Sequence, residues 1–276
     1  YQDGPALETY RLCLSKLSAI SGIRSCPVTS PDSLGTPKSE FLDGVRQALG
    51  RANIPPAELY ARLTDTVPEL EQQAAGVRRR LANNLPNLLD QLADMAAKGG
   101  WNVYRALGTE EAVGHVEAIV KKSGATNVVR SAQEVFDEVP LDSALATQNI
   151  KITTVAHDNE NSRESLRETI RQSGVGITGA DYALAETGTL VVLPRKGLSR
   201  LVSLVPPVHS ALGRAEDLLE TLDDLFLLRR LEYHQQDGEM GSYLNFITGP
   251  SRTADIEMTI VEGVHGPKEV HMIILG

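Results

Sequence analysis

The feature that most constrains the fold is a regular alternation of short β-branched or apolar runs with amphipathic segments. The runs predicted to form strands in the middle of the chain are 101–106, 127–130, 151–156 and 175–178. The segments predicted to form helices between them are 110–122, 131–138 and 161–173. Strands that alternate with helices predict an α/β protein with a largely parallel sheet and helices on its faces.

Other segments extend this pattern on both sides. Helices are also predicted at 38–50, at 68–98 with an interruption at Pro86, and at 215–236. The further strand-like segments are 188–193, 200–205, 243–248 and 269–275. Because several of these strands follow one another closely, we expect an antiparallel or mixed portion in the second half of the chain.

Residues 1–38 differ in composition from the rest of the chain. Prolines and glycines recur through this stretch and break any long element, which predicts a partly disordered N-terminal extension. The length of 276 residues allows one or two domains, and the remaining pattern favours a single domain over residues 39–276.

Composition excludes several classes of protein. The net charge of −9 and the aromatic content of 4% argue against a nucleic-acid-binding surface, which needs basic residues and exposed rings. The apolar runs are far shorter than the ~20 residues of a membrane span. Cys13 and Cys26 are too few to hold an iron–sulfur cluster and are expected to be reduced thiols of a cytoplasmic protein. His265 and His271 have no third ligand nearby, so no metal site is predicted.

Residues 174–179 match the G-x-G-x-x-G pattern of dinucleotide-binding proteins, but the context does not fit. The pattern follows a predicted helix and itself has the composition of a strand. Residues 187–215 contain no Asp or Glu that could bind the ribose. The match is therefore interpreted as incidental, and no cofactor is predicted for this chain.

The densest polar stretch is 178–189, in which Glu186 is followed by Thr187, Gly188 and Thr189. A glycine turn of this kind lets backbone N–H groups approach a ligand, because glycine has no Cβ. Glu186 is therefore a candidate catalytic base or nucleophile, with the three residues after it as candidate substrate ligands. The alternative is a tight connection in which Glu186 caps backbone donors.

Basic residues and a histidine follow this turn. Residues 171–214 carry five bases and two acids, a balance of +3 within an acidic chain. Arg195 and Arg200 are candidate ligands for an anionic substrate, and the alternative is a solvated basic loop. His209, which follows two prolines, is a candidate proton carrier or anion donor, and the alternative is a packed core histidine.

A third polar cluster follows the strand predicted at 243–248. The residues selected there as candidate anion ligands are Gly249, Ser251, Arg252 and Asp255, and His265 of the separate segment 263–267 is a further candidate. Loop N–H groups, a hydroxyl and a guanidinium in this order suit a phosphate or a carboxylate. The alternative is that Ser251 or Thr253 caps a helix.

The loops at 186–189 and 249–252 are predicted to form one site. Both follow or join predicted strands, and ligands of open α/β sheets bind outside the carboxyl ends of strands. We therefore expect the loops to converge at that end of the sheet, with His209 nearby, around an anionic small molecule.

Three long segments together resemble a known family. They are ITGADYALAETGTLVVLPRKGLSRLVSLVPPVH at 177–209, FITGPSRTADIE at 246–257 and VEGVHGPKEVHMIIL at 261–275. These segments resemble the lactate-utilisation (LUD) domain, and residues 39–51 are similar to the start of its protein C members. The resemblance covers residues 39–276 and leaves the N-terminal extension outside.

The resemblance implies a three-layer α/β fold of the sugar-phosphate isomerase and coenzyme A transferase type. It also implies a role with lactate utilisation proteins A and B in oxidising L-lactate to pyruvate. The partners would carry the iron–sulfur clusters, and this chain would carry none. Two alternatives stay open: a stand-alone acyl or coenzyme A transferase with Glu186 as nucleophile, and a ligand-binding regulatory module.

Overall fold

The computed structural model describes residues 38–50, 65–156, 163–193, 195, 198–236, 241, 243–254 and 260–276. The chain divides into two units, residues 1–64 and 65–276, which are described separately. In the first unit, α2 (Lys38–Ala48) confirms the helix predicted from residue 38, and its apolar Phe41 and Val45 are exposed. Residues 1–37 of the predicted extension lie outside the described residues.

The second unit is built on a six-stranded sheet of order β1-β12-β7-β4-β2-β3, in which every neighbouring pair is parallel. The strands are β1 (Asn102–Ala106), β2 (Asn127–Ser131), β3 (Lys151–Val155), β4 (Val175–Gly179), β7 (Val208–Arg214) and β12 (Glu269–Leu275). All residues of β4 are buried, because layers cover both faces of the sheet. The G-x-G-x-x-G match therefore lies in a central strand and forms no turn for a nucleotide.

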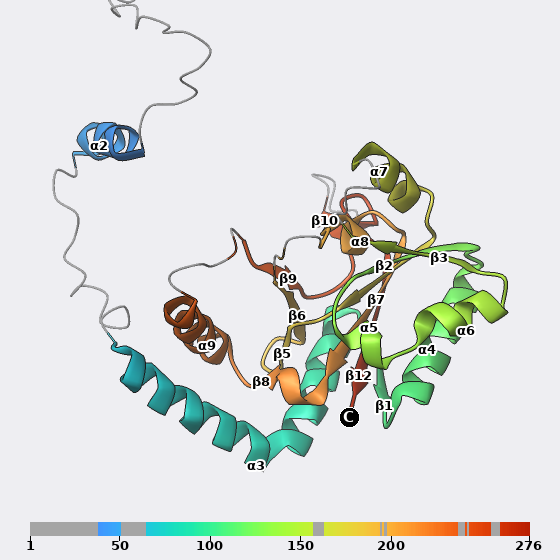
Figure 1. Cartoon of the computed structure of the whole chain (residues 1–276), viewed down its shortest axis with the longest axis horizontal. Helices are drawn as coiled ribbons and strands as arrows, with labels where there is room; N and C mark the ends of the chain where they lie inside the picture. The colour runs from blue at the N-terminus through green and yellow to red at the C-terminus, as the bar shows by residue number, and fades with distance from the viewer. Residues whose placement is uncertain are drawn as a thin grey trace, which may run out of the picture. The chain divides into compact units, whose positions relative to one another are not determined.

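Two layers cover the faces of this sheet (Figure 1). The helices α4 (Thr109–Ser123), α5 (Val135–Glu138) and α6 (Leu141–Thr147) share one apolar cluster with one face. The other face is covered by α3 (Val67–Gly99), α7 (Arg163–Arg171), α8 (Leu201–Leu204), α9 (Leu222–Gln235) and a small sheet. Successive residues of β12 point to opposite faces, so Met272 joins one cluster and Ile273 the other. The architecture confirms the predicted α/β class with a largely parallel sheet.

The second half of the chain contains the mixed portion expected from its closely spaced strands. A small sheet has the order β8-β5-β6-β9, with a parallel β5–β8 pair and antiparallel β5–β6 and β6–β9 pairs. Its strands are β5 (Tyr182–Leu184), β6 (Thr189–Val192), β8 (Leu218–Leu219) and β9 (Asn245–Ile247). A separate antiparallel hairpin pairs β10 (Arg252–Ala254) with β11 (Ile260–Glu262).

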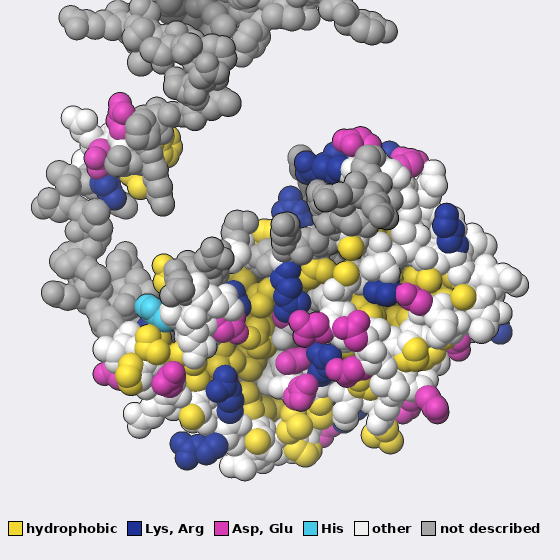
Figure 2. Space-filling view, in the orientation of Figure 1, with side chains coloured by type: hydrophobic (Ala, Val, Ile, Leu, Met, Phe, Trp, Pro, Cys, Tyr) yellow, Lys and Arg dark blue, Asp and Glu magenta, His cyan; other side chains and the backbone are white. Residues whose placement is uncertain are grey.

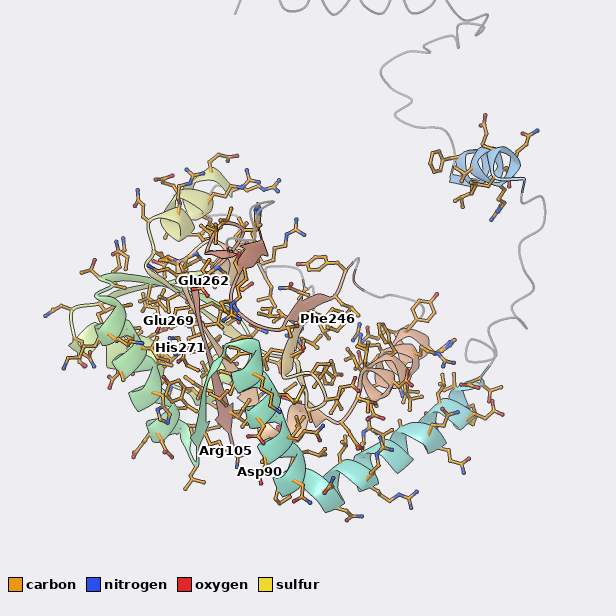
Figure 3. All side chains as sticks on the ribbon, turned by 180° about the vertical axis from the view of Figure 1, so that it is seen from behind. Asp90, Arg105, Phe246, Glu262, Glu269 and His271 are labelled. Atoms are coloured by element: carbon orange, nitrogen blue, oxygen red, sulfur yellow. The ribbon has the colours of Figure 1, made fainter. Side chains whose placement is uncertain are left out.

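The prediction that Pro86 interrupts the helix is wrong. α3 is one continuous helix of 33 residues that includes this proline. Thr66 and Glu69 form a capping box at its start, and Gly100, with φ 97°, ends it. Figures 1 and 3 show that the helix changes direction part-way along, as an internal proline causes by removing a backbone donor. Buried side chains before and after the proline hold both halves on the body. Asp90 also pairs with Arg105 of β1 at 2.7 Å (Figure 3).

Two other predictions in the second half fail. Residues 200–205 were expected to be a strand, but α8 occupies this position, with Val202 packed over Gly176 of β4. Short apolar runs do not distinguish a strand from a buried helical turn. The predicted helix at 215–236 begins only at Leu222, after the Thr221 cap. Among the described residues, no helix is long and apolar enough to cross a bilayer.

Candidate functional site

The main cleft lies where three neighbouring parallel strands end. Gln133 follows β2, Asp181 and Tyr182 follow β4, and Arg214 and Asp217 lie at and just after the end of β7. These residues line a volume of about 490 Å³, which we call the carboxyl-end cleft. It occupies the position, outside the carboxyl ends of strands, where open α/β sheets bind ligands.

The opposite wall of the carboxyl-end cleft comes from the small sheet and α9. Leu193 and Arg195 follow β6, and Arg229 and Glu232 project from α9. The charged side chains that line the cleft are Arg195, Arg214, Arg229, Glu134, Asp181, Asp217 and Glu232. Figure 2 shows such a mixture of acidic and basic side chains near the middle of the visible face. The cleft therefore suits a small polar ligand better than an apolar one.

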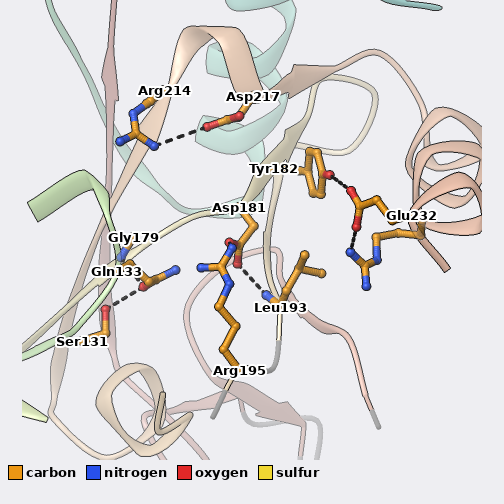
Figure 4. A network of polar contacts seen from close by, with 11 residues as sticks. Ser131, Gln133, Gly179, Asp181, Tyr182, Leu193, Arg195, Arg214, Asp217 and Glu232 are labelled. Carbon is orange, nitrogen blue, oxygen red and sulfur yellow. Dashed lines mark hydrogen bonds and ion pairs between the residues drawn. The ribbon is translucent and has the colours of Figure 1, made fainter. Parts of the chain in front are cut away.

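Gln133 places a free amide donor in the cleft. Its Oε1 accepts hydrogen bonds from the Gly179 N–H at 2.7 Å and the Ser131 hydroxyl at 2.6 Å (Figure 4). Those bonds fix the side chain, which is only 5% exposed. Its Nε2 is buried and has no hydrogen-bond partner in the described part of the chain. A buried donor without a partner costs about 1–3 kcal/mol, which a ligand oxygen would relieve.

Asp181 connects the sheet to the loop after β6. Its carboxylate accepts a hydrogen bond from the Leu193 N–H at 2.6 Å and pairs with Arg195 (Figure 4). Burial raises the pKa of Asp181, while the Leu193 hydrogen bond and the Arg195 charge act in the opposite direction. The pair fixes the Arg195 guanidinium, which is about half exposed, at the mouth of the cleft.

The wall formed by α9 carries a second polar network. The Tyr182 hydroxyl donates to Glu232 at 2.7 Å, and Arg229 pairs with the same carboxylate. Burial is the main cause that raises the pKa of Tyr182, so its hydroxyl stays protonated as a donor. The Nε of Arg229 is buried and has no partner among the residues described. The lining of the cleft thus includes a second residue with a buried donor that has no partner among the described residues.

Asp217 is the group in the cleft best suited to proton transfer near neutral pH. Burial raises its pKa to about 6, with further increases from Glu216 and Asp181 and a decrease from Arg214. Arg214 Nη1 lies 4.0 Å from an Asp217 oxygen (Figure 4). A carboxyl group whose pKa lies close to the working pH can act as a general acid or base.

We expect the Asp217 carboxyl to titrate with a midpoint near pH 6 in a carbon-13 NMR titration of labelled protein. Asp142 is the control, because the Arg130 hydrogen bond holds its pKa below 3.8. The native state binds more protons than the unfolded chain between pH 3.8 and about 6. The Asp217 contribution therefore lowers the free energy of unfolding as the pH rises through that window. An Asp217 midpoint equal to that of an exposed aspartate would contradict the assignment.

Glu186 lies outside the carboxyl-end cleft and caps a helix. Its Oε1 accepts a hydrogen bond of 2.7 Å from the Leu222 N–H in the first turn of α9. This is the capping alternative, in which the carboxylate satisfies a free backbone donor. In the same turn, the Thr187 hydroxyl donates to Thr189 at 2.8 Å. The backbone of Gly188 approaches Ala96 of α3, so the missing Cβ makes room for a helix rather than a ligand.

The two loops predicted to converge do lie side by side, but at the other end of the sheet. The Thr189 and Thr248 hydroxyls are 3.0 Å apart, and a Cβ on Gly249 would lie 2.3 Å from the Gly99 carbonyl. The Ser251 N–H donates to Pro267, just before β12 begins. These contacts place the loops at the amino ends of β1 and β12, so the predicted carboxyl-end position is wrong. The reason is that both loops pack on the end of α3, which leads directly into β1.

The remaining predicted anion ligands are separated in space. Arg252 pairs with Glu262 across the hairpin at 3.3 Å, and the Ser251 hydroxyl accepts from the His265 N–H at 3.1 Å. Arg200 lies over the Tyr243 ring, 5.5 Å from its centre, in another pocket. Of the predicted ligands, Arg195 reaches the carboxyl-end cleft. Asp255 lies outside the described residues.

His209 is a core residue of β7. It is fully buried, and its Nε2 lies 2.8 Å from the Thr178 hydroxyl. Burial lowers the pKa of His209 to about 3, and the nearby His271 adds to this effect. The imidazole is therefore neutral at physiological pH and has no path to solvent, which matches the alternative of a packed histidine. Among the described residues, no group of three or more His, Cys, Asp or Glu could hold a metal ion.

Sequence reasoning missed most of the cleft, and it missed Arg214 and Asp217 because no strand was predicted at β7. Gln133 and Asp181 each come two residues after a strand ends, and Asp217 comes three residues after β7. The sequence signal that could indicate these cleft residues is a polar residue just after a buried apolar run. β7 begins directly after the Pro206–Pro207 pair, at a place where the sequence analysis predicts no strand.

The parallel sheet with helices on both faces defines an α/β protein with a cleft at the carboxyl ends of its strands. The LUD domain model matches residues 89–275, and the chain belongs to this family.

The chain is also similar to individual proteins. Lactate utilization protein C of Halalkalibacterium halodurans is 35% identical over 58% of this chain and 67% of its own length. Lactate utilization protein C of Shouchella clausii is 34% identical over 55% of this chain and 63% of its own. Lactate utilization protein B of Bacillus licheniformis is 23% identical over 86% of this chain, which spans only 60% of that relative. The fold is also similar to a crystal structure of a DUF162 family protein from Deinococcus radiodurans, with 18% sequence identity and a TM-score of 0.49. That match covers 70% of this chain and 98% of the other chain.

Proposed function

We propose that this chain is the cluster-free subunit of a lactate-utilisation system and that its carboxyl-end cleft binds a small anionic molecule. Its relatives are named lactate utilization proteins C and B, which supports a role in a lactate-utilisation system. Only Cys13 and Cys26 are present, which supports a subunit without an iron–sulfur cluster of its own. The proposed partners are lactate utilisation proteins A and B in the cytoplasm, and they would hold the clusters.

The observation that carries the proposal is that two residues lining one cleft each hold a buried donor without a partner in the described part of the chain. Gln133 Nε2 and Arg229 Nε both need an acceptor, and a carboxylate or hydroxyl oxygen can supply it. Arg195 and Arg214 are basic groups of this lining that could pair with an anion, within a lining of three arginines and four carboxylates. A 2-hydroxy acid such as L-lactate, or the keto acid pyruvate, offers this combination of groups.

Different residues of the cleft have different roles in the proposed oxidation of lactate. Converting the alcohol to a ketone breaks the O–H and the Cα–H bond and releases two electrons and two protons. The iron–sulfur partners would take the two electrons, and the proton from Cα would pass to solvent. In this proposal the arginines hold the carboxylate, Gln133 orients a substrate oxygen, and Asp217 accepts the hydroxyl proton. The raised pKa of Asp217 supports that assignment, because the carboxylate is basic enough near neutral pH.

The transferase alternative has weaker support. A nucleophilic carboxylate must be free to attack, whereas Glu186 accepts the Leu222 N–H and lies outside the carboxyl-end cleft. The regulatory-module alternative predicts binding in the cleft without turnover in the presence of the partners. Lactate-dependent electron transfer separates it from the proposed subunit role.

A matched pair of arginine variants tests the proposed site. Arg195→Gln should weaken binding of L-lactate or pyruvate about ten-fold or more, because a charge-assisted hydrogen bond contributes about 1.5–3 kcal/mol. Arg252→Gln removes the same charge at the amino end of the sheet and should leave binding unchanged. Calorimetry of the full chain measures affinity, and lactate-dependent electron transfer with the co-purified partners measures activity.

Two results would contradict the proposal. If Arg252→Gln weakened binding and Arg195→Gln did not, the ligand site would lie at the 249–252 loop. If neither acid bound the chain alone or with its partners, the cleft would serve another ligand. Thermal denaturation of both variants shows whether a loss reflects unfolding, since Arg195 also pairs with the buried Asp181.

A further inference from the structure

We infer that a second pocket, between α7 and α8, binds an organic phosphate. This basic pocket has a volume of about 440 Å³, close to that of the carboxyl-end cleft. Its charged residues are Arg163, Arg167 and Arg200. Volumes of about 300–1,000 Å³ are typical of small-molecule sites. The inference rests on this pocket alone and does not depend on the function proposed for the cleft.

The charge of the basic pocket points to a multiply charged anion. The lining of the carboxyl-end cleft mixes arginines with carboxylates, whereas none of the described residues that line the basic pocket is Asp or Glu. Most arginines that the structure describes pair with a carboxylate, but Arg163, Arg167 and Arg200 have no such partner within the described ranges. Three guanidinium groups without a carboxylate suit the double charge of a phosphate better than the single charge of a carboxylate.

The rest of the lining suits an organic body attached to the phosphate. The apolar residues Val155, Leu166, Ile170 and Leu201 also line this pocket, and Leu166 and Leu201 are partly exposed. The Tyr243 ring lies 5.5 Å from the Arg200 guanidinium and forms part of the wall. Inorganic phosphate would leave this apolar surface exposed to water, whereas an aromatic or aliphatic ester would cover it. The geometry therefore favours an ester over the free ion.

The basic pocket adjoins the carboxyl-end cleft. A small cavity of about 20 Å³ shares Gln133 and Leu193 with the cleft and Ser199 and Arg200 with the basic pocket. Asn245 also lines it, and its Nδ2 is buried without a partner in the described part of the chain. An oxygen of a ligand that extends toward the cleft could satisfy this donor.

The test uses phenyl phosphate, inorganic phosphate and phenol as probes in calorimetric titrations of the full chain. We expect saturable binding of phenyl phosphate, weaker binding of inorganic phosphate, and no detectable binding of phenol. Arg167→Gln should weaken phenyl phosphate binding about ten-fold or more, as loss of a charge-assisted contact does. Arg171→Gln is the matched control, because Arg171 lies on the same helix, pairs with Glu168 and does not line the pocket. It should leave the affinity nearly unchanged.

Specific outcomes overturn the inference. Equal losses in Arg167→Gln and Arg171→Gln would show attraction to the general charge of α7 rather than a site. The absence of saturable binding of phenyl phosphate would remove the site altogether. A loss with Arg195→Gln but not with Arg167→Gln would move the ligand into the carboxyl-end cleft. Conversely, binding that survives Arg195→Gln supports a separate pocket even if the cleft proves not to bind lactate.

Discussion

Gly188→Ala is expected to lower the free energy of unfolding by about 3 kcal/mol or more, from backbone strain together with overpacking. Gly188 has a φ of 66°, in the left-handed region that favours glycine. A Cβ at this position would lie 2.2 Å from the Ala96 nitrogen and 2.5 Å from its Cα. These are backbone atoms of α3, so no side-chain rotation can relieve the clash. The turn and the helix would have to separate, which would disturb the apolar cluster between them.

Gly114→Ala is the matched control for this variant. Gly114 lies on α4 with nothing within 4 Å of the position that a Cβ would occupy. The same substitution should therefore stabilise the protein by about 0.5–1 kcal/mol through helix propensity. Denaturant unfolding of both variants measures the two changes, which should have opposite signs. An unchanged stability of Gly188→Ala would show that the turn is not held tightly against α3.

Removal of residues 1–88 is expected to abolish stable folding, whereas removal of residues 1–64 should shift the melting temperature by only a few degrees. The family match begins at residue 89, in the middle of α3. The first half of this helix buries Leu70, Val77 and Leu81 in the cluster that α9 also joins. Each such side chain contributes about 1.5–3 kcal/mol. Their combined loss is comparable to the ~5–15 kcal/mol of net stability of a typical domain.

Polar contacts also support this prediction, and point variants of the full chain test it even if the short chain cannot be purified. Arg80 pairs with Asp224 at 2.6 Å and with Glu220 at 2.8 Å, so the first half of α3 is also bonded to α9 and its approach. In the full chain, Leu70→Ala should cost about 2–5 kcal/mol, as typical core truncations do. Gln72→Ala, at an exposed position of the same helix, should be nearly neutral. A cooperative melt of residues 89–276 like that of residues 65–276 would place the first half of α3 outside the core.

The parts of the fold predicted best are those specified by local pattern. The strand predicted at 269–275 is β12 with the same limits, and the helix predicted at 110–122 is the body of α4. In these segments, apolar residues recur with the period of the element, so a short window contains the whole signal. The same holds for 174–179, where composition correctly indicated a strand in place of a nucleotide-binding turn.

The cleft was hidden from such reasoning because it depends on the order of strands in the sheet. Gln133, Asp181 and Asp217 are separated by long stretches of sequence and meet because β2, β4 and β7 are neighbours. No local pattern states which strands pair, since parallel pairing is decided by the packing of the crossover helices.

Tertiary packing decides the roles of the residues that look most like catalytic groups in the sequence. Glu186 and His209 have the chemistry of catalytic groups, but the carboxylate bonds to the start of α9 and the imidazole is buried beside Thr178. The sequence by itself determined the α/β class and the family, because local pattern and the order of motifs carry that information. Only the tertiary structure decided which polar groups face a cavity and which satisfy the backbone. That choice depends on neighbours brought together across the chain, and burial changes both the partners and the pKa of each group.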